Sequence, residues 1–256
     1  MQEQVEMRQV SKAFQSKTGE TIRGLSDVNL TLGQGEVVSV IGTNGAGKST
    51  LFNCLSGQIP IDQGEIYLDG IRVDGLNQVQ TAEFIGRVFQ NPSMGTAPRM
   101  TVFENLMLAQ KRGEARRFGR SLTNDNYQAM HDYLAGFRLD LEKRLDVPIE
   151  YLSGGQRQTV SLVMATLKRP KLLLLDEHTA ALDPRTARQV MEMTQEMIQS
   201  QGLTTLMITH HLQDALTYSD RILLMHQGSI QKIYQKDQIQ KLSAGELYEE
   251  LESLVL

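Results

Sequence analysis

The fold is decided by the stretch Gly42-Thr43-Asn44-Gly45-Ala46-Gly47-Lys48-Ser49. It matches the pattern G-x-x-x-x-G-K-[S/T] of a loop that binds phosphate groups. The apolar run 36–41 before it predicts a strand, and the residues from Gly47 onward predict a helix. Such a loop needs both neighbours, because its backbone N–H groups and the helix N-terminus point at phosphate oxygens. We therefore predict an α/β fold that binds a nucleotide at this loop.

The positions of the loop have separate expected roles. Glycines let the backbone approach the phosphates, and Lys48 supplies a positive charge for the β and γ groups. Ser49 carries a hydroxyl that can ligate Mg²⁺. The predicted cofactors are accordingly ATP and Mg²⁺. The residues predicted to bind ATP are Gly42, Thr43, Asn44, Gly45, Ala46, Gly47, Lys48, Ser49 and Thr50.

A second motif consists of the leucines 172–175 followed by Asp176 and Glu177. The continuous apolar run predicts a buried parallel strand, and its C-terminal end is where open α/β sheets bind ligands. We predict that Asp176 holds Mg²⁺, directly or through water, and that Glu177 polarises a water molecule against the γ-phosphate. An apolar strand that ends in an acid is common, but together with the phosphate loop it indicates nucleotide hydrolysis.

A third motif is Leu152-Ser153-Gly154-Gly155-Gln156. It predicts a helix start that binds an anion, with Ser153 as the N-cap and the glycine amides exposed. The pentapeptide resembles the signature sequence of the ABC ATPases. The resemblance implies that Ser153 to Gln156, with Gly154 and Gly155 between them, face the γ-phosphate of ATP held by a second subunit. Two copies of the chain would then enclose two nucleotides.

Four further residues resemble the same family in the same order along the chain. The resemblance implies that Gln90 senses Mg²⁺ and the attacking water, so Gln90 is a predicted catalytic residue and metal ligand. It implies that His210 contacts the γ-phosphate and that Asp183 crosses the dimer. Phe14 is similar to an aromatic residue that stacks on adenine. A Phe early in a strand can equally be a core residue, and this alternative stays open.

Two positions depart from the family's usual pattern. His178 stands where proline is usual, and Met164 stands where a basic residue is usual. Neither is a phosphate-binding position, so the departures suggest a particular subfamily with catalysis intact. The segments 161–167, 176–184 and 204–212 look like a bacterial importer subfamily. That subfamily works with an extracytoplasmic binding protein, and some members resemble systems for aromatic amino acids.

The order of the expected elements gives the fold class. Strands alternate with helices after Lys171, which predicts a mostly parallel sheet covered on both faces. Residues 1–35 predict antiparallel strands, 64–70 predict a strand closed by an Asp-Gly turn, and Thr101–Glu104 predicts a capping box. We predict a single domain over 1–256. Its parts are a nucleotide-binding core with a β lobe at about 1–90 and 166–235, an inserted helical lobe at about 91–165 and a C-terminal helical extension at about 236–256.

Composition argues against several other classes of protein. A net charge of −4 gives no basic field, so nucleic acid is not an expected partner. The longest apolar runs, 37–41 and 172–175, fall far short of the ~18 residues that span a bilayer. The lone Cys54 excludes an intramolecular disulfide framework and is expected to be a small buried residue. The adjacent His210 and His211 do not have the spacing of a metal site.

Several interpretations of function remain open at this stage. The chain is expected to be the ATP-hydrolysing motor of an importer on the cytoplasmic face of the membrane. An exporter motor and a soluble assembly ATPase are the alternatives, because each can be a lone domain. The expected partners are a second copy of the chain, transmembrane permease subunits and, indirectly, an extracytoplasmic binding protein. A basic cluster is either solvated or contacts a partner subunit or anionic headgroups, and consists of Lys111, Arg112, Arg116, Arg117 and Arg120.

Overall fold

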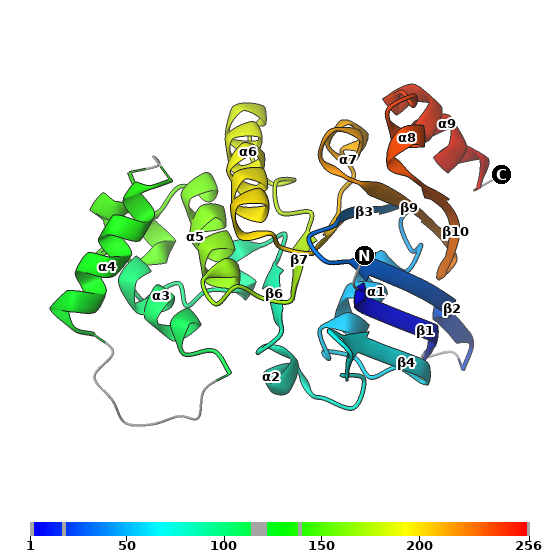
Figure 1. The fold of residues 1–256 in the computed structure, drawn as a ribbon, viewed down its shortest axis with the longest axis horizontal. Helices are drawn as coiled ribbons and strands as arrows, with labels where there is room; N and C mark the ends of the chain where they lie inside the picture. The colour runs from blue at the N-terminus through cyan, green and yellow to red at the C-terminus, as the bar shows by residue number, and fades with distance from the viewer. Residues whose placement is uncertain (1–2, 17–18, 114–121, 138–139, 255–256) are drawn as a thin grey trace.

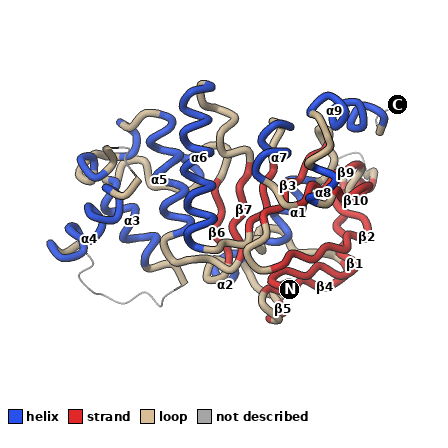
Figure 2. The backbone as a smooth tube through the Cα atoms, turned by 45° about the horizontal axis from the view of Figure 1, so that its top comes forward, coloured by secondary structure: helices blue, strands red, loops and turns tan. Residues whose placement is uncertain are grey.

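The computed structural model describes residues 3–16, 19–113, 122–137 and 140–254. Of the basic cluster, Lys111 and Arg112 lie in these ranges, whereas Arg116, Arg117 and Arg120 lie outside the described residues. Figure 1 shows an elongated molecule, with a group of helices at one end and a β lobe, accompanied by the C-terminal helices, at the other. A central sheet lies between these two ends, and Figure 2 shows the same separation of helices and strands.

The central sheet has six strands in the order β10-β9-β3-β8-β7-β6. All neighbouring pairs are parallel except β10 with β9. Every residue of β3 and β8 is buried, which explains their continuous apolar sequences. The strands are β3 (Val37–Gly42), β6 (Ile85–Val88), β7 (Leu172–Asp176), β8 (Thr205–Ile208), β9 (Arg221–His226) and β10 (Ser229–Tyr234).

The sequence pattern does not predict two of these strands, β6 and β10. β6 has four residues, including a glycine and an arginine, so its apolar signal is weak. β10 is a partly exposed edge strand whose polar residues hide the alternation. The turn at Gln227 and Gly228, with φ of 47° and 79°, is the one local signal of the β9–β10 hairpin.

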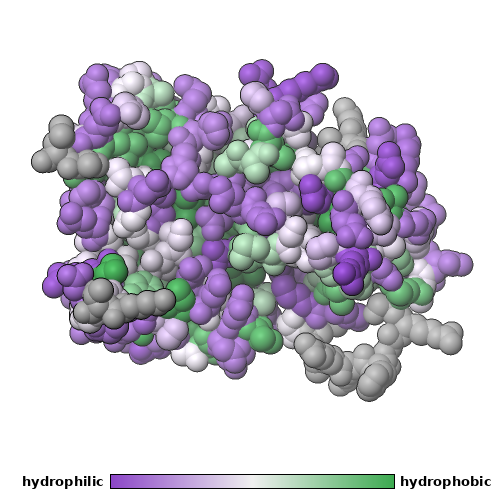
Figure 3. Space-filling view, turned by 180° about the vertical axis from the view of Figure 1, so that it is seen from behind, coloured by the Kyte–Doolittle hydropathy of each residue, from purple (hydrophilic) through white to green (hydrophobic). Residues whose placement is uncertain are grey.

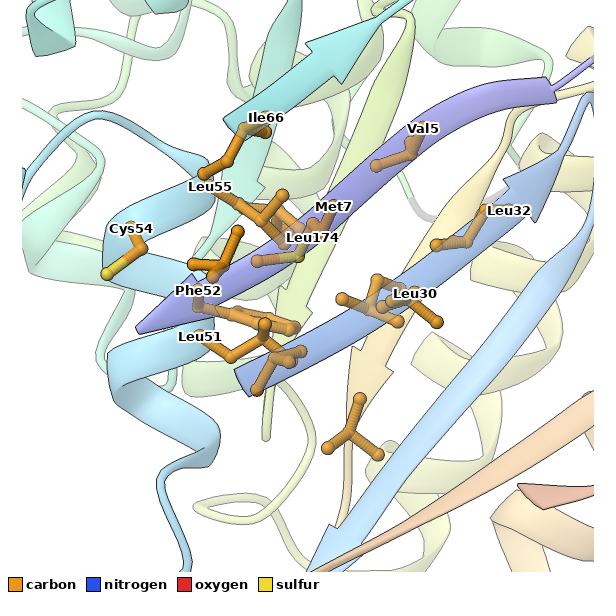
Figure 4. Packing of buried hydrophobic residues seen from close by; sticks show 14 of the residues in the cluster. Val5, Met7, Leu30, Leu32, Leu51, Phe52, Cys54, Leu55, Ile66 and Leu174 are labelled. Atoms are coloured by element: carbon orange, nitrogen blue, oxygen red, sulfur yellow. The ribbon is translucent and has the colours of Figure 1, made fainter. Parts of the chain in front are cut away.

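The second sheet is antiparallel and has the order β2-β1-β4-β5. Its strands are β1 (Glu3–Gln15), β2 (Thr21–Gly33), β4 (Gln63–Leu68) and β5 (Ile71–Arg72). The Asp69–Gly70 turn between β4 and β5 has both φ angles positive, as predicted for an Asp-Gly hairpin. Helix α1 (Lys48–Leu55) packs between the two sheets. Figure 4 shows Phe52 and Leu51 of α1 beside Met7, Leu30 and Leu174 in this apolar core.

The helical lobe is built from α3 (Val102–Gln110), α4 (Asn124–Ala135) and α5 (Gly154–Thr166). The predicted capping box begins α3: Glu104 N donates to Thr101 Oγ1, and Thr101 N donates to Glu104 Oε2. Short 3-10 segments accompany these helices, namely η1 (Pro92–Met94), η2 (Glu142–Arg144) and η3 (Ile149–Tyr151). Helix α2 (Gln78–Thr81) lies instead beside the end of α1, where Thr81 Oγ1 donates to Ser56 O at 2.6 Å. A second apolar cluster joins the lobe to one face of the central sheet.

The remaining helices are α6 (Pro184–Gln201), α7 (Leu212–Tyr218), α8 (Lys236–Ile239) and α9 (Ala244–Ser253). Met191, Met193 and Met197 of α6 are buried in the second apolar cluster, where they pack like ordinary core residues. Cys54 is also buried, and burial raises the pKa of its thiol to about 11. Among the described helices, none is both long enough and apolar enough to cross a bilayer. Hydrophilic side chains cover most of the face in Figure 3.

Candidate functional site

The phosphate loop lies at the carboxyl end of β3, where α1 begins. A Cβ at Gly42 would lie 2.3 Å from Met225 O, and one at Gly47 would lie 2.5 Å from Gly24 O. Gly47 also has φ 99°, so both positions need glycine for steric or conformational reasons. Residues 43–46 form the turn between the strand and the helix, and Ser49 and Thr50 lie in the first turn of α1.

Lys48 is buried over its own loop. Its Nζ donates to Gly42 O at 2.6 Å and to Thr43 O at 3.0 Å. Desolvation lowers the pKa of the ammonium, while the nearby carboxylates of Glu177 and Asp176 favour its charged form. The loop therefore has a cation at the position where phosphate oxygens are predicted to bind.

The predicted carboxylates follow β7 at the same edge of the sheet. Asp176 Oδ2 accepts a hydrogen bond from Arg87 Nη2 at 2.8 Å, and both side chains are largely buried. Glu177 leaves the strand with φ 48°, a left-handed conformation that is uncommon for a non-glycine residue. Its N–H donates to Ile208 O at 3.0 Å, which ties the end of β7 to the end of β8.

Glu177 is held by the two other predicted catalytic residues. His210 Nε2 donates to Glu177 Oε1 at 2.6 Å, and Gln90 Nε2 donates to Glu177 Oε2 at 3.3 Å. His210 follows β8 by two residues and Gln90 follows β6 by two, so three strand ends meet at this carboxylate. The structure thus brings Glu177, His210 and Gln90 together from positions far apart in the sequence.

The predicted Mg²⁺ ligands present oxygen atoms only: a hydroxyl at Ser49, a carboxylate at Asp176 and an amide oxygen at Gln90. Oxygen donors suit this hard cation, which usually completes its shell with water and substrate phosphates. No cluster of three or more His, Cys, Asp or Glu side chains is placed to hold a metal within the described ranges. The residues therefore fit a Mg²⁺ ion that arrives with a nucleotide.

The signature motif lies at the start of α5. Ser153 Oγ accepts from Gln156 N, and Gln156 Oε1 accepts from Ser153 N, so Ser153 is the predicted N-cap. Gly155 packs against α6, because a Cβ there would lie 2.3 Å from Thr186 Cγ2. Asp183 caps α6 by accepting from Thr186 N at 3.1 Å. The signature helix and Asp183 are therefore neighbours within one chain.

Phe14 lies on β1 opposite Ile22 of β2. Its ring packs on Gly24, where a Cβ would approach the ring to 2.5 Å and Thr50 Cγ2 to 3.0 Å. Thr50 belongs to the first turn of α1, so the ring lies beside the phosphate loop. Phe14 is half-buried and Ile22 is 56% exposed. Together the two side chains form an apolar surface beside the phosphate loop, against which a flat ring can pack.

The sequence motifs do not predict Arg87, which bonds to Asp176. The signal that could have identified it is a charged residue inside the apolar segment Ile85–Val88. A charge in such a place needs a partner, because burying it unpaired is costly.

Comparison with known proteins identifies the family. The family model described as ABC transporter matches residues 25–180. A tyrosine transport ATP-binding protein of Clostridioides difficile is 41% identical, covering 98% of this chain and 100% of that protein. A phosphonates import ATP-binding protein of Lactococcus lactis subsp. lactis is 35% identical, covering 88% of this chain and 91% of that one. The chain belongs to the ABC transporter family.

Solved structures agree with this family in fold. A dimeric ATP-binding cassette in a post-hydrolysis state, bound to ADP and Pi, has a TM-score of 0.78 at 27% identity. The match covers 91% of this chain and 98% of that one. A nucleotide-free ATP-binding cassette of an ABC transporter has a TM-score of 0.80 at 25% identity, covering 97% and 98%.

These comparisons confirm the predicted family, the fold class and the similarity to importer subunits. The chain is an ATP-binding subunit of an ABC transporter, and it hydrolyses ATP with Mg²⁺ as cofactor. Membership of the family implies dimerisation and membrane permease subunits as partners.

Proposed function

We propose that this chain drives solute import and that its hydrolytic centre is Glu177. The observation that supports this assignment is the placement of the Glu177 carboxylate between His210 and Gln90. Both contacting groups come from other strand ends, so the carboxylate is oriented before a nucleotide arrives. An oriented carboxylate beside a phosphate site can accept a proton from an attacking water.

The other site residues have complementary roles in this proposal. Lys48 exchanges its bonds to loop carbonyls for bonds to the β- and γ-phosphates, while Ser49, Asp176 and Gln90 hold Mg²⁺. Bound Mg²⁺ neutralises charge that develops on the phosphate oxygens. His210, which pairs with Glu177, contacts the γ-phosphate in this proposal, and Phe14 supports the adenine ring.

We further propose an ATP-dependent homodimer on the cytoplasmic face of the membrane. Ser153 to Gln156 of one copy would contact the nucleotide of the other, with Asp183 beside this contact. The dimeric cassette that resembles this chain supports such an arrangement. The permease subunits would receive substrate from an extracytoplasmic binding protein, in agreement with the import proteins among the relatives.

The proposed cargo is an amino acid, with tyrosine as the first candidate. The relative named for tyrosine transport is 41% identical over 98% of this chain and 100% of that protein, whereas the phosphonate relative has 35% identity over 88% of this chain. An exporter motor and a soluble assembly ATPase stay as alternatives. Capture of the tagged chain from detergent-solubilised membranes separates them, since an assembly ATPase would retain soluble partners and no membrane subunits.

Uptake and nucleotide binding test the proposal together. Cells that express the chain with its membrane subunits should accumulate labelled tyrosine, and Glu177→Gln should abolish this uptake.

Lys48→Ala should weaken ATP binding by about 1.5–3 kcal/mol, because a charged hydrogen bond to phosphate is lost. Calorimetry of the purified chain measures this change. An unchanged dissociation constant for ATP would remove Lys48 from the phosphate site.

A further inference from the structure

Arg87 lies where three segments of the site meet. It belongs to β6, and its guanidinium is surrounded by α1, by the end of β7 and by the residues that follow β6. Each of these segments has one of the proposed Mg²⁺ ligands: Ser49 in α1, Asp176 in β7 and Gln90 after β6. None of the motifs discussed above gives Arg87 a role.

The first contact is with α1. Arg87 Nη1 donates to Asn53 Oδ1 at 2.7 Å and lies 3.3 Å from Ser56 Oγ. Asn53 is four residues after Ser49 in the same helix, so the two side chains are neighbours on one helix face. A bond to Asn53 therefore fixes the helix face that presents the Ser49 hydroxyl.

The second contact is with β7. Arg87 Nη2 donates to Asp176 Oδ2 at 2.8 Å. The two side chains are 11% and 18% exposed, so the pair is largely shielded from water. A guanidinium presents its N–H groups in a rigid plane, which sets the orientation of a bound carboxylate. With Oδ2 bonded in this way, Oδ1 of Asp176 accepts no side-chain hydrogen bond from any residue that the structure describes, so this oxygen is available to a metal or its water.

The third contact is with the segment that leads to Gln90. The Arg87 guanidinium lies 4.7 Å from the ring centroid of Phe89, the residue directly before Gln90. It also lies 5.9 Å from the centroid of the Phe52 ring of α1. The guanidinium therefore contacts the segment before Gln90 as well as Asn53 and Asp176.

We propose that Arg87 is a positioning residue for Mg²⁺, which holds the Ser49, Asp176 and Gln90 segments at the spacing that the ion requires. The inference rests on the proposed ligands above. Arg87 itself is not a ligand, because its side chain has only donors. It acts through Asp176 and through the helix face that carries Ser49. Residues that orient metal ligands typically affect metal affinity by about 10- to 100-fold.

The Arg87→Lys variant tests whether the planar shape of the guanidinium, rather than its positive charge alone, is needed for Mg²⁺ binding. Lysine keeps the positive charge near Asp176, but its compact ammonium does not replace a planar fork that spans Asn53 and Asp176. The measurement uses Glu177→Gln as the background, so that ATP stays intact. Displacement of a fluorescent ATP analogue gives the Kd of ATP in EDTA and in Mg²⁺, and the ratio of the two is the coupling between metal and nucleotide. Mn²⁺ binding, followed by electron paramagnetic resonance, provides a second readout that does not depend on hydrolysis.

The coupling ratio should fall about tenfold or more in Arg87→Lys, while the Kd in EDTA stays within about twofold of the background. A coupling ratio equal to the background value overturns the proposal, and so does a larger ratio, which would mean that Arg87 competes with the metal. Should Arg87→Lys not fold, Asn53→Ala removes only the contact with α1. It should lower the ratio by a smaller factor, and an unchanged ratio again counts against the proposal.

Arg221→Lys is the matched control. Arg221 lies on β9 of the same sheet, three strands away from β7, and pairs with Glu36; both side chains are 15% exposed. This variant should lower thermal stability and leave the metal coupling unchanged. A fall in the coupling ratio equal to that of Arg87→Lys would make the effect nonspecific and overturn the proposal.

Asp176→Asn distinguishes failure of the Mg²⁺ ligand assignment from failure of the positioning role of Arg87. If it abolishes coupling while Arg87→Lys does not, Arg87 has no positioning role and the ligand assignment stands. If Asp176→Asn keeps the coupling, the ligand assignment fails, and the role of Arg87 fails with it.

Discussion

The strand ends that form the catalytic site and the start of α5 satisfy their polar groups in different ways. At the strand ends, Lys48, Asp176 and Glu177 each have a partner within the chain. At the start of α5, the side chains of Ser153 and Gln156 bond only to each other's backbone N–H groups within the described part of the chain. The charged side chains of the first region have partners within one copy of the chain. The second region bonds only within its own helix cap, so it can still make contacts with a partner.

The backbone N–H groups at the start of α5 differ from the strand ends in the same way. No hydrogen bond within the described residues occupies the N–H of Gly154 or Gly155. Free amides at a helix N-terminus attract anions, because they are donors at the positive end of the helix dipole. The strand ends thus satisfy their polar groups within one chain, whereas the α5 start keeps free donors, which fits the proposal that it contacts a nucleotide held by a second copy. The following predictions test this distinction.

Glu177→Gln should have the largest effect. The amide cannot accept the proton of an attacking water, so ATP hydrolysis should fall about 10²- to 10⁴-fold. MgATP binding should persist, because Lys48 and Asp176 are unchanged, and the protein should accumulate as an ATP-bound dimer. A phosphate-release assay and gel filtration with ATP measure the two effects. Wild-type turnover in this variant would exclude Glu177 as the base.

Mixing two inactive variants tests whether the two regions belong to one site. Lys48→Ala and Ser153→Ala should each be inactive alone. A mixed dimer pairs the intact Lys48 of one copy with the intact Ser153 of the other, so part of the hydrolysis should return if one site suffices. A Ser49→Cys, Ser153→Cys double variant gives a direct check, since ATP should promote crosslinks between copies. Crosslinks confined to single chains would refute a shared site.

His178 should make the fold sensitive to acid. It directly follows Glu177, is buried, and its Nε2 lies 3.1 Å from Thr194 Oγ1. Burial lowers its pKa from 6.5 to about 4, so the neutral form favours the folded state. Its contribution is complete above pH 6.5 and is lost as the pH falls toward 4, where the loss reaches about 3 kcal/mol.

Urea unfolding at pH 7.5 and 5.0 tests this contribution. His178→Gln removes the titrating group and should reduce the difference in unfolding free energy between these pH values by about 2 kcal/mol. His131→Gln is the control, because the side chain of His131 on α4 is 41% exposed, whereas His178 is buried. Equal pH dependence in wild type and His178→Gln would show that His178 does not titrate in this range.

Gly155→Ala should have the smallest effect and should reveal the packing beneath the signature. The added Cβ meets Thr186 Cγ2 at 2.3 Å, so the variant should lose about 1–2 kcal/mol of stability. Thr186→Ser removes a methyl group there and should restore most of the loss. Gly154→Ala is the matched control, since its Cβ meets only the tip of Leu182 at 3.3 Å. Thermal unfolding without nucleotide compares Gly155→Ala, the Gly155→Ala, Thr186→Ser double variant and Gly154→Ala with the wild type.

Features that depend on residues close together in the sequence were predicted correctly, whereas contacts between residues far apart in the sequence were not. The phosphate loop, the Ser153 cap and the Thr101–Glu104 capping box depend on residues within one turn of each other, and their backbone geometry is as predicted. Asp176 lies at the expected strand end because a run of leucines defines a buried strand. The spacing of Gln90 and His210 in the sequence does not place them in one site; that prediction came from the family resemblance alone.

Contacts across long sequence distances could not be predicted. Arg87 and Asp176 are 89 residues apart, and nothing local to either residue indicates the other. His178 is visible in the sequence as a departure from the family pattern. Its burial against Thr194 depends on how α6 packs on β7, which the local sequence does not specify.

The position of Lys48 has a consequence for the rate of nucleotide capture. Its ammonium bridges the carbonyls of Gly42 and Thr43, so the loop is preorganised by its own side chain. Little conformational entropy remains to be lost when a phosphate arrives, and binding becomes an exchange of hydrogen-bond acceptors on a rigid frame. A frame of this kind allows fast association, and affinity then depends mainly on how quickly the nucleotide leaves.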